Sequence, residues 1–456
     1  MQITRHFADI GPRRVHYRRC GAGPVLLMVH QSPRSSAEYE ALMHNWGTQF
    51  TCIAPDTPGF GQSDPLSGDD PSIEDFADAI VALIDALGIG PVAAYGFHSG
   101  GIILVTALKR HPEKFRALAI GGYAIWTPQE VALFGEHYLP PFLPSSYGEH
   151  LTWLWNRMLE QSWFFPWFDV RPETWLSGAH ADVARVDAAV REMLNSGAAY
   201  RAGYGAVLRA PRDIPPVDAV TPPVLITAYD GDPLQAHIDR LGAMPKGWAA
   251  AKVACPAEHH AASLAFLKQH ASGDAPPARG AEDEGFVAIT TDHFAGLIHW
   301  RGRKGGAVIL HPPGSAADLT DPGDSAAIDL PGHGLSDAWP SEPPESWPAW
   351  QQVIDAAAEA LGATSVILPA VPPGNPELLF PDLTPDRFGS YLTRAWAIVR
   401  ARHFFDPWYE ANAAHARHFD LTEINADMLA REHRALIRAT AARPYLIALR
   451  SREGES

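Results

Sequence analysis

The sequence predicts an α/β protein with a mostly parallel sheet, a helical lid and a partial repeat of the same unit. Short apolar strands alternate with helices up to residue 120, and the alternation returns from residue 223. A glycine-rich turn, Gly96–Gly101, joins a strand to a helix. Sequence runs from the first half return in the second half of the chain. Strands that alternate with helices form a parallel sheet covered on both faces.

Composition limits the function. A chain of 456 residues suggests more than one domain, and its net charge of −16 argues against nucleic acid or an anionic membrane as partner. The cysteines Cys20, Cys52 and Cys255 are too few and too widely spaced for a disulfide framework or a zinc motif. The N-terminus lacks the apolar stretch of a signal peptide, and no apolar run approaches ~20 residues. We therefore expect a cytoplasmic protein that acts on a small molecule.

The elements of the first half follow from periodicity and turn residues. A helix begins after Ser72, which forms a capping box with Asp75, and it ends at Gly88. An irregular, aromatic-rich segment, the predicted lid, runs from about 123 to 212. Alternation then resumes and ends with a helix over 264–270. The expected strands are 15–18, 25–29, 52–55, 91–94, 115–120, 223–227 and 252–254.

The turn after the fourth of these elements, Tyr95–Gly101, has the pattern Gly-x-nucleophile-x-Gly. Glycines are needed because a tight turn beside a strained residue leaves no room for Cβ atoms. Counted from Gly96, the nucleophile position holds His98, and Ser99 follows it. Histidine is an unusual residue for this position.

Five features together resemble the α/β-hydrolase superfamily over residues 1–270. They are an H-x-x-P loop at His30, a D-x-P-G-x-G-x-S-D run at Asp56, the turn at Gly96, a late acid and a late histidine. The resemblance implies a triad acid at Asp232, with Asp230 as the alternative, and a base at His260, with His259 as the alternative. It also implies an oxyanion-binding loop in which Gln31 and the backbone N–H groups of Ser32 and Ser99 face the substrate.

Four hypotheses remain for His98. It can act as nucleophile or general base beside Asp232 and His260. Ser99 can be the nucleophile through a shifted turn. The set His98, Asp232 and His260 can bind Zn or Fe, although we predict no metal and no cofactor. Finally, the site can be inactive and serve only to bind a ligand.

The lid supplies candidate pocket walls. Trp126, Trp153 and Trp163 have no tryptophan counterpart in the second half of the chain. We therefore expect them to line a pocket that favours an apolar or aromatic substrate.

Residues 286–451 repeat part of the first unit. The loop at His311 and the run Asp329–Asp337 repeat the loop at His30 and the run at Asp56. At a constant offset of 274 residues, Pro372 stands opposite His98, so the repeat has no nucleophile. We predict a domain at 1–271, a linker at 272–285 and a degenerate, truncated copy at 286–456. The copy should pack on the first unit or build a homodimer through paired lids.

These features predict hydrolysis, or a related cofactor-free cleavage, of an ester, thioester, lactone or C–C bond in a small apolar or aromatic organic acid, with His98 in the nucleophile position. The alternatives are a non-catalytic protein of this fold that binds a small ligand, and a metal-dependent enzyme that uses His98, Asp232 and His260.

Overall fold

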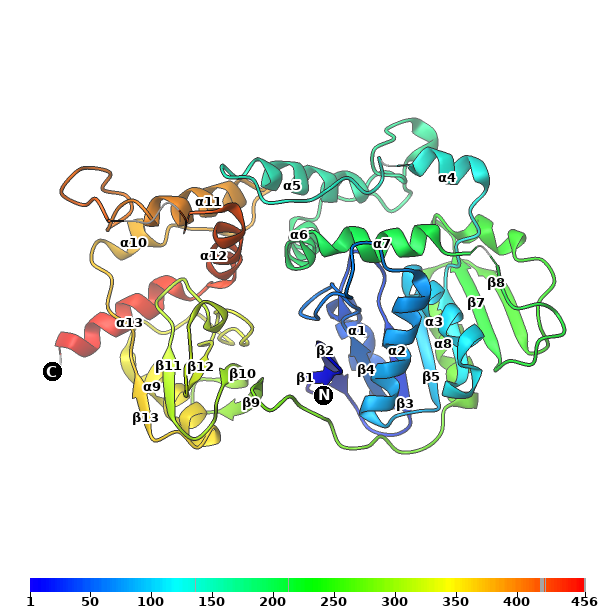
Figure 1. Cartoon of the computed structure of the whole chain (residues 1–456), viewed down its shortest axis with the longest axis horizontal. Helices are drawn as coiled ribbons and strands as arrows, with labels where there is room; N and C mark the ends of the chain where they lie inside the picture. The colour runs from blue at the N-terminus through cyan, green and yellow to red at the C-terminus, as the bar shows by residue number, and fades with distance from the viewer. Residues whose placement is uncertain (136, 212, 419–421, 423, 455–456) are drawn as a thin grey trace. The chain divides into compact units, whose positions relative to one another are not determined.

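The computed structural model describes residues 1–135, 137–211, 213–418, 422 and 424–454. It divides into two compact units (Figure 1). The first unit comprises Met1–Leu143 and Asn156–Gly280, and the second comprises Pro144–Trp155 and Ala281–Ser456. The chain passes between the units at both ends of the lid segment Pro144–Trp155 and once more inside the predicted linker. The placement of the lid segment Pro144–Trp155 in the second unit is a feature that the sequence does not predict.

The first unit contains a mixed, mostly parallel sheet in the order β1-β2-β4-β3-β5-β6-β7-β8. β1 pairs antiparallel with β2, and β2 with β4, whereas every later pair is parallel. The predicted α/β fold is therefore confirmed. The strands are β1 (Thr4–Ile10), β2 (Arg13–Cys20), β3 (Val25–Val29), β4 (Thr51–Pro55), β5 (Val92–Phe97), β6 (Phe115–Gly121), β7 (Val224–Tyr229) and β8 (Trp248–Val253).

Helices cover both faces of this sheet and form the lid between β6 and β7. The predicted end of the lid, residue 212, lies outside the described residues. The helices are α1 (Glu40–Trp46), α2 (Ile73–Leu87), α3 (Ser99–Arg110), α4 (Pro128–Phe134), α5 (Glu149–Gln161), α6 (Val183–Ser196), α7 (Ala199–Arg209) and α8 (Pro256–His270). Short 3₁₀ turns occupy Ser36–Tyr39, Pro112–Lys114, Pro172–Thr174 and Gln235–Arg240.

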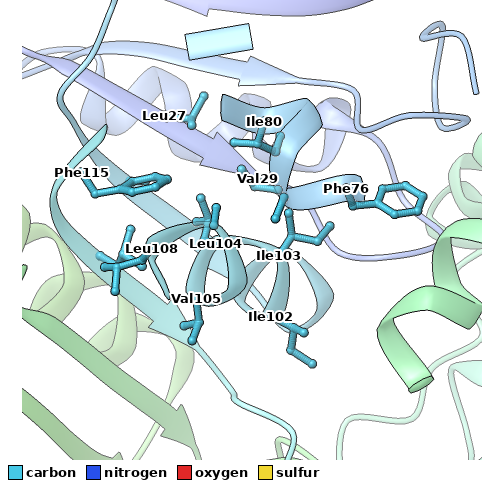
Figure 2. Packing of buried hydrophobic residues seen from close by; sticks show 14 of the residues in the cluster. Leu27, Val29, Phe76, Ile80, Ile102, Ile103, Leu104, Val105, Leu108 and Phe115 are labelled. Atoms are coloured by element: carbon cyan, nitrogen blue, oxygen red, sulfur yellow. The ribbon is translucent and has the colours of Figure 1, made fainter. Parts of the chain in front are cut away.

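Strand β3 shows how the sheet is buried. Successive side chains of a strand point to opposite faces. Leu27 and Val29 pack in one cluster with residues of α2, α3 and α7, whereas Leu26 and Met28 pack in another with residues of α1 and α8. Figure 2 shows the first of these clusters around α3. Because α3 is buried on this face, the turn that precedes it is held rigidly at the end of β5.

The second unit has its own sheet in the order β13-β11-β12-β10-β9. β9 pairs antiparallel with β10, and β10 with β12, while β11 pairs parallel with β12 and β13. Read from β9, this order and these directions match those of β1-β2-β4-β3-β5. The strands are β9 (Glu284–Thr290), β10 (Ala295–Gly302), β11 (Ala307–Leu310), β12 (Ala326–Ile328) and β13 (Ser365–Ile367). The helices are α9 (Trp347–Ala360), α10 (Pro376–Leu379), α11 (Ser390–Arg402), α12 (Ala426–Arg438) and α13 (Ala442–Gly454), with a 3₁₀ turn at Ala317–Leu319.

The lid segment of the second unit contacts α11 reciprocally. The Trp155 Nε1–H donates to the Arg387 carbonyl at 3.1 Å, and the Trp396 Nε1–H donates to the Ser146 carbonyl at 3.3 Å. The ring of Trp155 lies against Gly389, and the ring of Trp396 lies against Gly148. The members of each matched pair are 241 positions apart in the sequence. A segment and its repeat thus make the same contact in both directions.

One element differs clearly from expectation. The last helix of the first unit begins at Pro256, eight positions before the predicted start at Leu264. Proline fits the first helical position, because its missing N–H would have no intrahelical partner there. Within the described part of the chain, no helix is both long and apolar enough to span a membrane.

Candidate active site

The turn between β5 and α3 places His98 in a strained conformation. His98 has φ 47° and ψ −110°, and among the described residues it is the one non-glycine residue with positive φ. Its N–H donates to the Gly121 carbonyl at 2.7 Å, and its carbonyl accepts from the Ile102 N–H at 3.1 Å. A Cβ on Gly96 would lie 2.8 Å from the backbone of Gly100. Such strain persists only where the surroundings impose it, and it is concentrated at functional sites.

His98 and Asp232 form a hydrogen-bonded pair. The Nε2 atom of His98 lies 3.1 Å from both Asp232 carboxylate oxygens. The Asp232 side chain is fully buried, whereas that of His98 is 23% exposed. Asp232 also accepts the Leu234 N–H at 2.8 Å. The structure therefore brings together two of the three predicted triad residues, and of the two acids considered it selects Asp232 rather than Asp230 for this contact.

The charge of Asp232 determines which nitrogen of His98 carries the proton. Burial alone would raise the pKa of Asp232, but the His98 ring and the Leu234 amide hold it below its ordinary value. An ionised carboxylate only accepts hydrogen bonds, so in the neutral imidazole Nε2 carries the hydrogen and Nδ1 keeps its lone pair. Among the described residues, none is hydrogen-bonded to Nδ1. Nδ1 is consequently the nitrogen available for chemistry.

His260 lies away from this pair, contrary to expectation. Its ring packs edge-on against Trp46 at a centroid distance of 6.3 Å, within the α1 and α8 side of the sheet. The cause is the early start of α8. With the helix beginning at Pro256, His260 lies in its second turn rather than in a loop at the carboxyl end of β8.

His259, the alternative base, faces the sheet below the site. Its Nε2 lies 2.8 Å from the Tyr95 hydroxyl and its Nδ1 lies 2.6 Å from the Thr227 hydroxyl. Burial, with a contribution from His260, lowers the pKa of His259 to about 4. The Phe97 ring stacks on His98 at 4.0 Å and meets His259 edge-on at 5.8 Å. His259 is thus a neutral structural support for Phe97.

The loop that we expect to bind an oxyanion lies beside Ser99, and its donors at Gln31 and Ser32 already have partners within the protein. The Ser32 N–H donates to the Ser99 hydroxyl at 2.5 Å. Gln31 donates through its backbone and its side chain to Glu38, at 2.8 and 3.1 Å. The Ser99 N–H begins α3, where the first amides of a helix have no intrahelical acceptor. Ser99 therefore contributes two groups to the site. Its backbone N–H has no hydrogen-bond acceptor within the helix, and its hydroxyl accepts the hydrogen bond of the Ser32 N–H.

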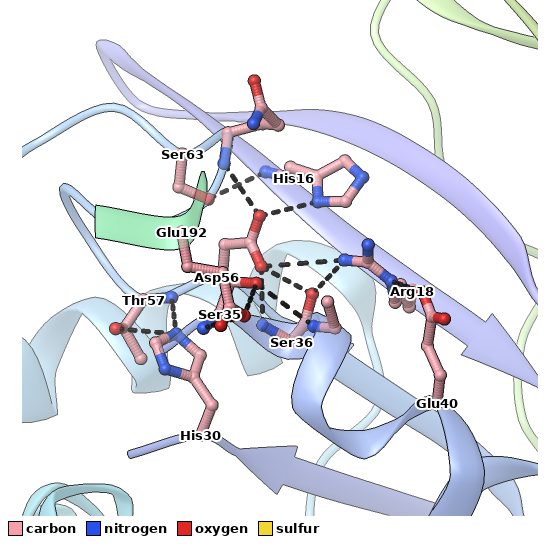
Figure 3. Close-up of polar contacts among 12 residues, drawn as sticks. His16, Arg18, His30, Ser35, Ser36, Glu40, Asp56, Thr57, Ser63 and Glu192 are labelled. Carbon is pink, nitrogen blue, oxygen red and sulfur yellow. Dashed lines mark hydrogen bonds and ion pairs between the residues drawn. The ribbon is translucent and has the colours of Figure 1, made fainter. Parts of the chain in front are cut away.

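A buried carboxylate, Asp56, fixes this loop (Figure 3). Asp56 accepts the Ser36 N–H and the Gln62 N–H, each at 2.8 Å, and lies 2.8 Å from His16 Nδ1. Burial opposes its ionisation, but His16 and then Arg18 hold the pKa of Asp56 well below its ordinary value. The D-x-P-G-x-G-x-S-D run is thus a structural device that holds the loop in place.

Glu192 from α6 ties the same loop to the lid. It accepts the Ser35 N–H at 3.0 Å and the Ser35 hydroxyl at 2.7 Å, and it pairs with Arg34. His30 accepts the Thr57 N–H at 2.9 Å. The loop geometry therefore depends on groups from the segment that follows β4 and from the lid.

A cavity of about 50 Å³ lies over His98 and Ser99. Trp126 lines it, as predicted, whereas Trp153 and Trp163 do not; the Trp163 Nε1–H instead donates to the His180 carbonyl at 2.7 Å. The sequence analysis does not predict the other aromatic walls of the cavity. One of them, Tyr204, stands between the two glycines Gly203 and Gly205 of α7. Besides His98, Ser99, Gln31 and Ser32, the lining residues are Ile102, Ala124, Trp126, Phe134, Tyr138, Phe165, Tyr204, Val207, Leu208, Pro233 and Leu234.

The predicted metal ligand set does not assemble. Because His260 packs against Trp46, only His98 and Asp232 meet. Throughout the described ranges, no group of three or more His, Cys, Asp or Glu side chains is arranged to hold a metal ion. The metal hypothesis based on His98, Asp232 and His260 is therefore wrong in its geometry.

Residues 24–134 match the family described as alpha/beta hydrolase fold. This segment contains β3, β5, the loop at His30 and the His98 turn. Its fold is thus that of an α/β hydrolase.

Individual proteins resemble the same region. Haloalkane dehalogenase 2 of Mycobacterium tuberculosis is 30% identical over 125 residues, which cover 27% of this chain and 44% of that protein. The 2-(acetamidomethylene)succinate hydrolase of Mesorhizobium japonicum is 36% identical over 111 residues, covering 24% of this chain and 39% of that protein. The chain therefore spans less than half the length of these curated relatives.

Solved structures match at lower identity. A thermophilic esterase from Thermogutta terrifontis has a TM-score of 0.43 at 17% identity, covering 59% of this chain and 99% of that one. Epoxide Hydrolase A from Mycobacterium thermoresistibile has a TM-score of 0.45 at 16% identity, with coverages of 59% and 99%.

Proposed function

We propose that this protein is a hydrolase that cleaves an ester, thioester, lactone or C–C bond of a small apolar or aromatic organic acid, with a His98–Asp232 dyad in place of a triad. The observation that carries the proposal is the position of His98 at the strained turn, with Nε2 3.1 Å from both oxygens of Asp232. The relatives that match this region include hydrolases.

In this mechanism His98 acts as a general base through the lone pair of its Nδ1 atom. Nδ1 takes a proton from water while the water oxygen attacks the substrate carbonyl carbon. Asp232 stabilises the imidazolium that results, as a buried carboxylate does in a triad. His98 then returns the proton to the leaving group as the C–O or C–S bond breaks. Direct attack by Nδ1 would instead give an acyl-imidazole, which would show as a burst of the first product.

The developing oxyanion needs hydrogen-bond donors. The Ser99 N–H stands at the start of α3, where the helix dipole also favours negative charge. The Ser32 N–H becomes a second donor once the Ser99 hydroxyl releases it. A rotation of one serine side chain is therefore part of the proposed reaction.

The apolar cavity supports a small substrate. The cavity of about 50 Å³ is small and most of its walls are aromatic or aliphatic, which favours a short apolar acyl group. Turnover of p-nitrophenyl acetate, its thioester analogue and longer-chain esters tests the proposal. We expect activity that falls with acyl length and is absent from His98→Ala; equal activity in that variant would overturn the proposal.

Two observations favour a second candidate, a non-catalytic protein that binds a small ligand. The Ser32 N–H is already satisfied by the Ser99 hydroxyl, and His260 lies elsewhere. In that case substrate analogues would bind without turnover, and His98→Ala would leave their affinity within about twofold. Measuring binding and turnover on the same protein sample separates the two functions.

A further inference from the structure

The second unit has a cavity of its own, with about 240 Å³ of free volume. Pro312 and Pro313, in the loop after β11, form one wall, as Gln31 and Ser32 do after β3 in the first unit. Pro372, which the sequence repeat sets opposite His98, forms another. The remaining lining residues are Ser315, Ala370, Leu379, Phe380, Arg402, Phe405, Asp406, Trp408 and Arg417. The lining thus lacks a nucleophile but includes arginines.

Arg402, the last residue of α11, lines this cavity, and none of the described acids forms an ion pair with its guanidinium. Its side chain as a whole is partly exposed, yet Nη2 is buried and has no hydrogen-bond partner among the described residues. The guanidinium lies over the Phe380 ring, with Cζ 5.1 Å from the ring centroid. Burial lowers the pKa of Arg402 to about 10, so the group stays charged at neutral pH.

The neighbouring charges leave Arg402 available. Glu432, the acid whose charge acts on Arg402, is hydrogen-bonded to His403 at 2.9 Å. Asp406 lines the cavity but is exposed to water. Arg417 adds a second positive charge and donates from Nη1 to the Arg402 carbonyl at 3.2 Å. Two cations and one exposed acid therefore face the cavity.

We propose that this cavity of the second unit binds a small aromatic or aliphatic monocarboxylate, with the carboxylate on Arg402 and the apolar body against Phe380, Phe405 and Trp408. A planar guanidinium pairs with a carboxylate through two parallel hydrogen bonds. The rings and prolines of the wall suit an apolar body. Arg417 is exposed, so Arg402 is the one partly buried cation at the cavity, and a single negative charge matches it better than the several charges of a phosphate ester. This site is separate from the His98 site and does not depend on the proposed hydrolase activity.

The test measures binding of phenylacetate to the full-length protein by calorimetry, with phenylacetamide as the uncharged analogue of nearly the same shape. We expect saturable binding of phenylacetate and binding of the amide weaker by about tenfold or more, because one charge-assisted pair is lost. Binding should persist in His98→Ala. No saturable binding of phenylacetate, or loss of binding in His98→Ala, would overturn the proposal.

Two variants locate the site. Arg402→Gln removes the charge in the cavity and should weaken phenylacetate binding about tenfold or more, whereas Arg303→Gln removes an exposed arginine of the same unit and should leave it unchanged. If Arg402→Gln fails to fold, the variant Ala370→Trp tests instead whether phenylacetate binds in this cavity. Ala370 is exposed at the cavity wall, so a large side chain there should block the cavity without disturbing the core. Unchanged affinity in the folded variants would contradict the assignment.

Discussion

The Nε2 atom of His98 is equidistant from the two carboxylate oxygens of Asp232, at 3.1 Å from each. Asp232→Asn replaces one acceptor oxygen with an NH₂ group that can donate to Nε2. The proton of the ring then moves to Nδ1, which loses its lone pair. We expect kcat for p-nitrophenyl acetate to fall by about 10³- to 10⁴-fold while the fold is kept. A loss below about tenfold would show that the tautomer does not matter.

His98 and Ser99 should respond oppositely to truncation. His98→Ala removes the proposed base and should lower kcat/KM by about 10³-fold or more. Ser99→Ala keeps the Ser99 amide and frees the Ser32 N–H, so activity should be unchanged or higher. Steady-state kinetics of both variants checks this. A severe loss in Ser99→Ala together with a mild one in His98→Ala would identify Ser99 as the nucleophile.

The backbone strain at His98 should be measurable as a difference in the free energy of unfolding between two variants. With φ 47° and ψ −110°, any side chain at this position is strained, and glycine is not. We expect His98→Gly to be more stable than His98→Ala by about 1 kcal/mol or more in denaturant unfolding, although both are inactive. Equal stabilities would mean that the native backbone relaxes once the imidazole is removed.

The contact between Trp155 and Gly389 predicts an effect in the second unit. A Cβ on Gly389 would overlap the indole ring, and its φ is 65°. Gly362 has φ 64° and open space around it, so Gly362→Ala carries the backbone strain alone. We expect Gly389→Ala to cost about 1–3 kcal/mol more than Gly362→Ala, seen as a lower Tm. A similar Tm for the two variants would show that the ring moves aside freely.

A buried histidine of the second unit should make its stability depend on pH. Burial alone would lower the pKa of His299, but hydrogen bonds to Asp329 at 2.8 Å and Glu284 at 3.1 Å raise it from 6.5 to about 9. A raised pKa in the folded state contributes stability that is complete below pH 6.5 and is lost as the pH rises through about 9. The contribution is on the order of 3 kcal/mol.

Thermal melts between pH 6 and pH 10 check this dependence. His299→Gln should flatten the profile over that window. Glu284→Gln should keep part of the stabilisation by His299, because Asp329 remains. The pKa of His299 should be raised less in this variant, so the stabilisation should be lost at a lower pH. A profile that is the same in all three proteins would exclude His299 as the titrating group.

The sequence predicts the fold well where local patterns decide it. The glycines of the Gly96 turn and the apolar strand before it are sufficient to place His98 at the turn. The prediction that His260 joins the site as its base was wrong, because the fold family suggests a loop there, whereas Pro256 starts a helix soon after β8. Proline at a first helical position was the available signal. The link between Ser32 and Ser99 depends on tertiary packing and has no sequence pattern.

The reciprocal contact between the lid segment and α11 has a consequence for assembly. A surface that contacts its own copy in both directions is self-complementary, which is the property of an isologous interface between identical subunits. Here both halves of that interface belong to one chain: Trp155 uses the site at Gly389, and Trp396 uses the site at Gly148. The symmetry closes within the monomer, so a second chain could add to this surface only by displacing the copy that already occupies it.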